Sequence, residues 1–116
     1  MTAMKILGIG KRAENATAMQ ELLRASGHEA TNFAISDDAE GDALLVEQLR
    51  DGGYDAVTIG SFINGQHPEL PASPQTTAWF NRILNLIAEH APGTKVVLVR
   101  KPSEVVQAVH SVLHDG

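Results

Sequence analysis

The residues best suited to chemistry lie in two stretches, each directly after an apolar run of strand length. The first is GIGKRAENATA, Gly8 to Ala18, which joins glycines to Lys11 and Arg12. Glycines allow a ligand to approach the backbone, and cations beside a helix N-terminus favour an anion such as a phosphate group. The candidate ligand-binding residues of this stretch are Gly10, Lys11, Arg12, Asn15 and Thr17.

The second stretch, SFINGQHPELPASP, runs from Ser61 to Pro74 and is long for a connection between a strand and a helix. Its three prolines stiffen it, and Phe62 and Leu70 could hold a flat apolar ligand among varied polar groups. The alternative interpretation is a rigid surface loop without a ligand. The candidate ligand-binding residues here are Ser61, Phe62, Asn64, Gly65 and His67.

Neither stretch contains a diagnostic catalytic set. Ser61 lacks the G-x-S-x-G pattern of a hydrolase, and His67 with Glu69 could exchange a proton but has no partner nucleophile of recognisable spacing. His110 and His114 lie one helical turn apart, as two metal ligands can, but an exposed polar face explains them as well. We therefore predict no catalytic residue and no metal site, and we expect the sole tryptophan, Trp79, to pack in the core.

The elements that position these residues follow from four apolar runs, residues 5–10, 29–36, 55–62 and 95–100, separated by segments of helical periodicity. Alternating strands and helices predict an α/β protein with a parallel sheet and right-handed crossovers. We expect one flavodoxin-like domain over residues 1–116, a three-layer α/β/α sandwich with a doubly wound, four-stranded sheet in the order 2-1-3-4.

Helix starts are predicted from capping residues. Asn15 is expected to cap the first helix, Asp42 to precede the second, Ser73 with Pro74 to begin the third, and Ser103 to begin the last. The last helix is expected to bury five apolar residues: Val105, Val106, Val109, Val112 and Leu113.

The strand order predicts where a ligand binds. In a doubly wound sheet, the carboxyl ends of the strands that flank the reversal diverge and leave a crevice. Here these are the first and third strands, so the two chemical stretches should line it. Four of the nine basic residues fall at this edge, Lys11, Arg12, Arg100 and Lys101, as do several carboxylates that could pair with them.

The amino-acid composition limits the kinds of partner that we expect. The 116 residues carry a formal net charge of −5, so nucleic acid is an unfavourable partner. The absence of cysteine excludes disulfides, thiolate metal sites and cysteine nucleophiles. Residues 1–8 lack a basic segment followed by an apolar stretch of signal-peptide length, and no run is long enough for a membrane span. We expect a cytoplasmic protein that does not bind membranes, with a small phosphate-bearing ligand or a protein as its partner.

Three segments resemble a response-regulator receiver domain: LLRASGHEATNFAISDD, LRDGGYDAVTIGS and EHAPGTKVVLVRKPSEVVQAVHSVL. Lys101 matches the receiver lysine. Ile9 and Gly10 stand where receivers have the acidic pair that holds magnesium, and Ser61 stands at the phosphoacceptor aspartate. The resemblance therefore implies a regulatory module without magnesium-dependent phosphorylation.

A second resemblance is to flavodoxins and flavodoxin-like FMN reductases, through MKILGIGKRAENATAMQELL, DAVTIGSFINGQHPELP and TAWFNRIL. It implies an FMN phosphate against residues 11–17 and an isoalloxazine ring against residues 62–65. Gly8, Gly10 and Ala13, with Asp37, also fit the G-x-G-x-x-A pattern of dinucleotide-binding folds.

Two functions are thus predicted. The first is a non-catalytic binding or regulatory module that acts through a protein partner or a small anionic ligand. The alternative is an FMN- or nucleotide-binding protein with redox activity. An open crevice of ligand size would favour the second, whereas a crevice filled by Phe62 and Leu70 would favour the first.

Overall fold

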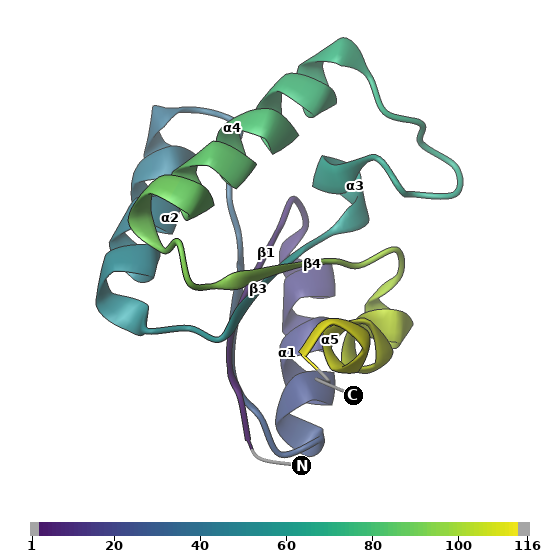
Figure 1. Cartoon of the computed structure of the whole chain (residues 1–116). Coiled ribbons are helices and arrows are strands. Elements are labelled where there is room, and N and C mark those ends of the chain that lie inside the picture. Colours follow the sequence, from purple (N-terminus) through teal and green to yellow (C-terminus); the bar gives the residue numbers. More distant parts are fainter. Residues whose placement is uncertain (1–2, 114–116) are drawn as a thin grey trace.

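Four parallel strands form a single sheet in the order β2-β1-β3-β4 (Figure 1). The structure is a computed structural model that describes residues 3–113. The predicted strand order and α/β class are confirmed. The strands are β1 (Lys5–Gly10), β2 (Glu29–Ala34), β3 (Ala56–Ile59) and β4 (Lys95–Leu98).

Helices cover both faces of the sheet and make the predicted three layers (Figure 1). On one face lie α1 (Ala13–Ala25) and α5 (Val105–Leu113), and on the other lie α2 (Ala39–Gly52) and α4 (Pro74–His90). A single turn, α3 (Ser61–Asn64), follows β3, and a 3-10 turn (Pro102–Glu104) precedes α5. The molecule is therefore a flavodoxin-like α/β sandwich.

Each face has its own hydrophobic core because successive strand residues point to opposite sides. Ile6 of β1 packs toward α1 and α5, whereas Leu7 packs toward α2 and α4. All four residues of β3 are buried, as expected for a central strand covered on both faces. Trp79 is 3% exposed in the core beneath α4, so its predicted packing role is confirmed.

The start of α4 follows its capping residues as predicted. The Ser73 hydroxyl accepts from the Thr76 N–H at 3.1 Å, the Thr76 hydroxyl accepts from the Ser73 N–H at 2.8 Å, and Pro74 opens the helix. This reciprocal capping box satisfies backbone donors that would otherwise lack partners. It fixes where the long α3–α4 loop ends.

Three other helix predictions are wrong. Helix α1 begins at Ala13, so Asn15 lies inside its first turn and the N-cap is Arg12 in an extended conformation. Helix α2 begins at Ala39 because Asp38, rather than Asp42, accepts from the Gly41 N–H at 2.9 Å. The last helix is preceded by a 3-10 turn, and Val112 on it is 41% exposed.

The region predicted as one loop from Ser61 to Pro74 is helical in its first four residues, as α3. The turn forms because the N–H groups of Ile63 and Asn64 donate to the Gly60 carbonyl, and it ends at Gly65 with φ of +80°. Within residues 3–113, no helix is both long and apolar enough to cross a bilayer.

Candidate functional site

The two stretches predicted to meet at the carboxyl edge of the sheet do meet there. They line an open groove of about 550 Å³, together with the segment after β4. We call it the basic groove. Its lining residues are Arg12, Glu14, Asn15, Ser61, Phe62, His67, Pro68, Glu69, Arg100, Lys101 and Pro102.

Three cations reach the basic groove from two separate loops. Arg100 donates to the Glu104 carboxylate at 2.8 Å, and this contact holds the pKa of the Glu104 carboxyl below its usual range. Arg12 is 3.8 Å from Glu14, and both side chains are more than half exposed. Lys101 makes no ion pair within the described residues. Two of the three cations thus have a carboxylate within 4.0 Å, at exposed positions where water screens the ion pairs, and Lys101 has none among the described residues.

The first turn of α1 adds backbone donors to the same groove. Arg12 provides no side-chain cap, and within residues 3–113 no hydrogen bond is formed by the N–H groups of Ala13, Glu14 and Asn15. These N–H groups carry the positive end of the helix dipole. An anion at this turn would meet both the donors and the Arg12 guanidinium.

An aromatic wall closes one side of the basic groove. The Phe62 ring lies 4.6 Å from the His67 ring between centroids, and the Arg12 guanidinium lies 4.7 Å from the Phe62 centroid. His67 Nδ1 accepts from the Glu69 N–H at 3.1 Å, so the neutral ring carries its proton on Nε2. His67 can therefore donate a hydrogen bond to a ligand.

The space directly between the ends of β1 and β3 is much smaller. This narrow cavity, bounded by Gly10, Gly60, Ser61 and Phe62 among others, has a volume of about 20 Å³. Such a volume holds one water molecule but not a ring system. Phe62 thus folds in, as the first predicted function requires, whereas Leu70 is 50% exposed and does not. The basic groove beside Phe62 stays open at ligand size, as the alternative function requires.

These dimensions bear on FMN. The predicted ring-binding residues 62–65 belong to α3, where Asn64 Nδ2 donates to the carbonyls of Ile59 and Val99 at 2.8 and 3.2 Å. Asn64 Oδ1 accepts from the Gln66 N–H at 2.8 Å, so the whole amide is engaged by the protein itself. A flavin ring could not enter the narrow cavity, and the Asn64 amide is not free to hydrogen-bond to one, whereas Phe62 also lines the larger basic groove.

The structure thus gathers most of the candidate residues, but not all. Arg12, Asn15, Ser61, Phe62 and His67 line the basic groove, while Gly10 and Lys11 line the narrow cavity beside it. Asn64, Gly65 and Thr17 line neither. Asn64 and Gly65 shape the α3 turn, and Thr17 is exposed on the second turn of α1.

Arg100 and Lys101 were predicted to lie at this edge but were not among the candidate binding residues. The signal for them is their position immediately after the fourth apolar run, since the carboxyl ends of parallel strands share one edge. Pro102 lines the groove as well, and no pattern in the sequence identifies it as a site residue.

The glycine pattern of β1 has a packing explanation. A Cβ on Gly8 would lie 1.9 Å from Asn32 Nδ2, so the side chain of Asn32 occupies the space that Gly8 leaves. At Gly10, by contrast, a Cβ would meet nothing within 4 Å. Asp37, the predicted acidic partner of the pattern, accepts from Arg82 at 2.6 Å. The first glycine therefore serves the sheet rather than a nucleotide.

His110 faces His28 rather than a metal site. The two Nε2 atoms are 3.1 Å apart, and His28 Nδ1 accepts from the Met4 N–H at 3.1 Å. Because Nδ1 is an acceptor, neutral His28 has its proton on Nε2, where a metal would have to bind. No cluster of three potential metal ligands occurs among the described residues, and His114 lies outside them.

Comparison with models of known protein families gives no match, and comparison with curated proteins gives none. The class of the protein is therefore defined by its architecture, a flavodoxin-like α/β sandwich with a basic groove at the carboxyl edge of the sheet.

Proposed function

We propose that this protein is a non-catalytic binding module that takes a small phosphate-bearing anion in the basic groove. The observation that carries the proposal is the convergence of Arg12, Arg100 and Lys101 with the free N–H donors of the α1 first turn. Cations and helix N-terminal amides recognise phosphate oxygens through charge and hydrogen bonding together.

The net charge of the chain does not oppose such a site, because local charge decides binding at a groove. Two carboxylates do line it, Glu14 and Glu69. Glu14 is 71% exposed and only 3.8 Å from Arg12, an ion pair that water screens and a phosphate group can replace. A compact anion near the helix end, away from Glu69, is therefore favoured over an extended polyanion.

The groove lacks the parts of an enzyme that acts on such a ligand. His67 can donate through Nε2, but no nucleophile or second acid–base group within the described residues is hydrogen-bonded to it. A regulatory role, in which the bound anion changes the surface offered to a protein partner, fits these residues better than catalysis. Redox activity with FMN is the alternative function.

The test is a calorimetric titration with inorganic phosphate, pyrophosphate, AMP and FMN, supported by thermal unfolding. A ligand at 100 times its dissociation constant stabilises the folded state by about 2.7 kcal/mol. We expect a single saturable site for a phosphate compound. Binding of FMN with the shifted absorption and quenched fluorescence of a buried flavin would favour the redox alternative.

A matched pair of variants locates the site. Arg12→Ala/Lys101→Ala removes two cations from the groove, whereas Arg50→Ala/Lys95→Ala removes two exposed cations from elsewhere. Both variants change the net charge equally, so non-specific attraction falls equally. Loss of binding in the first alone supports the proposal, and equal weakening in both contradicts it.

A further inference from the structure

A second groove opens at the same edge of the sheet, on the face covered by α2 and α4. Its volume is about 750 Å³, within the range of small-molecule sites. We call it the Leu44 groove. Its lining residues are Lys11, Ala34, Ile35, Ser36, Asp37, Leu44, Ser73, Gln75, Thr76 and Trp79.

The wall of the Leu44 groove is apolar in its α2 and α4 parts. Leu44 is 46% exposed, although its neighbour Leu45 on the same helix is fully buried. Trp79 and Ile35 are buried behind the groove at 3% and 4% exposure. An apolar group placed on Leu44 would therefore extend an existing hydrophobic core and lose water-exposed area.

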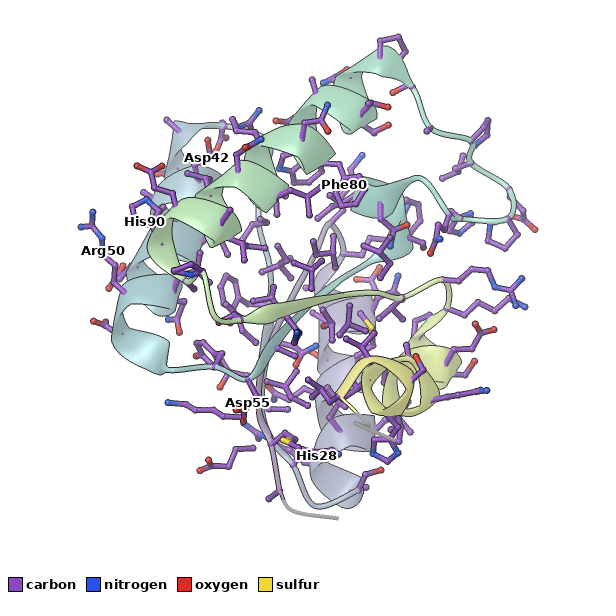
Figure 2. The ribbon with its side chains drawn as sticks, viewed as in Figure 1. His28, Asp42, Arg50, Asp55, Phe80 and His90 are labelled. Carbon is purple, nitrogen blue, oxygen red and sulfur yellow. The ribbon has the colours of Figure 1, made fainter. Side chains whose placement is uncertain are left out.

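The charges around the groove leave one cation without a partner. Asp37 accepts from Arg82 at 2.6 Å, and Arg82 also donates to Asp42 at 2.7 Å, so one guanidinium is shared between two carboxylates. Figure 2 shows Asp42 on α2 where it meets α4. Lys11 has no carboxylate within 4.0 Å among the described residues and is exposed. Lys11 is therefore the cation in the lining of the Leu44 groove that an anionic group could pair with.

Some polar groups of the Leu44 groove already have hydrogen-bond partners, and one does not. Ser73 and Thr76 bond to each other in the capping box, and Ser36 donates to Asp38 at 2.6 Å. The Trp79 indole N–H, in contrast, is buried with no hydrogen-bond partner among the described residues. Buried donors nearly always have a partner, so this N–H is an unsatisfied donor on a residue that lines the groove.

We propose that the Leu44 groove binds an organic anion with an apolar body, such as an aromatic carboxylate, with its anionic group at Lys11 and its body on Leu44. The site is separate from the basic groove and does not depend on the proposed function. An inorganic phosphate would not fill it, because most of its recognition is apolar contact with α2 and α4.

The sole tryptophan makes the proposal directly measurable, since every change in tryptophan emission comes from Trp79 at the wall of this groove. The probe is 8-anilinonaphthalene-1-sulfonate, an aromatic sulfonate whose absorption overlaps tryptophan emission. We expect saturable quenching of Trp79 with one site per chain, together with enhanced probe fluorescence. The titration is repeated with saturating inorganic phosphate, which should leave the affinity unchanged.

Two matched variants decide the location. Leu44→Glu places a negative charge where the apolar body should lie and should weaken the probe at least about tenfold, the effect of losing roughly 1.4 kcal/mol of apolar contact. Leu22→Glu, at a leucine of similar exposure on α1, should leave it unchanged. Both positions are exposed, and circular dichroism checks that the variants fold. Lys11→Gln should also weaken binding.

Three results would overturn the proposal: no saturable quenching, equal weakening by Leu44→Glu and Leu22→Glu, or displacement of the probe by phosphate. The last would place the organic anion in the basic groove. Failure of the phosphate titration alone would refute the proposed function and leave the Leu44 groove supported.

Discussion

The contact between His28 and His110 predicts how stability depends on pH. His28 is 6% exposed, at the lower end of the molecule in Figure 2, and its two ring nitrogens face the Met4 N–H and His110 Nε2. A proton added to His28 Nδ1 would meet the Met4 N–H. This arrangement therefore opposes protonation of His28.

Burial, and then the neighbouring His110, lower the pKa of His28 below its ordinary value of 6.5. The unfolded chain consequently binds this proton at a higher pH than the folded protein does. The contribution of neutral His28 to the free energy of unfolding is fully present above pH 6.5. It decreases as the pH drops through 6.5, and it stops decreasing below the pKa of folded His28. The slope for one proton cannot exceed about 1.4 kcal/mol per pH unit.

The assay is urea unfolding at several pH values between about pH 7.5 and about pH 5.5, where histidine is the main titrating side chain. His28→Asn keeps an acceptor for the Met4 N–H but cannot titrate. We expect this variant to lose stability less steeply with falling pH than the wild type. The control is His90→Asn, at a histidine on α4 well apart from His28 in Figure 2, which should keep the wild-type slope.

Parallel stability curves for the wild type and His28→Asn would refute the reasoning, because they would show that folding does not exclude the His28 proton. A reduced slope in His90→Asn as well would assign the effect to histidine content rather than to this contact.

Two further predictions concern stability. Gly8→Ala should destabilise the protein by about 1 to 3 kcal/mol, since its methyl group would overlap Asn32, whereas Gly10→Ala should change the urea midpoint little; equal effects would contradict the packing explanation. Ser73→Ala should cost about 1 kcal/mol through loss of the capping box, and Ser103→Ala should cost less because Ser103 is exposed and makes no side-chain hydrogen bond within the described residues; thermal unfolding of both variants measures the difference.

The topology was predictable because it follows from local patterns. Continuous apolar runs marked the central strands, and alternation with helices implied parallel pairing and right-handed crossovers. The start of α4 could also be predicted, because the capping interactions of Ser73 and Pro74 involve only residues close to them in sequence. The edge of the sheet where ligands bind then followed from the strand order alone.

The start of α1 could not be predicted correctly from the sequence. Asparagine is a preferred N-cap residue and arginine is not, so the capping preference favours Asn15 over Arg12. The chain enters the helix earlier, with Arg12 extended and Glu14 in the first turn, where a negative charge suits the helix dipole. This difference matters for the site, since it leaves the first N–H groups without a side-chain cap.

Contacts between residues distant in sequence could not be predicted either. Asn64 was predicted to touch a ligand, but its amide bonds to the Val99 carbonyl, 35 residues away, and His110 meets His28, 82 residues away. Only the packed sheet and helices bring these groups together. The residue types indicate that these side chains form hydrogen bonds. Whether the partner is a ligand or the protein itself depends on the fold.

The most direct test of the central claim is a titration of the isotopically labelled protein with inorganic phosphate, followed through its backbone amide resonances. Phosphate in the basic groove should shift the amides of Ala13, Glu14 and Asn15 most, with Lys101, along one saturable curve. Absence of saturation, or shifts spread over exposed cations such as Arg50 and Lys95, would contradict the claim that this groove is an anion site.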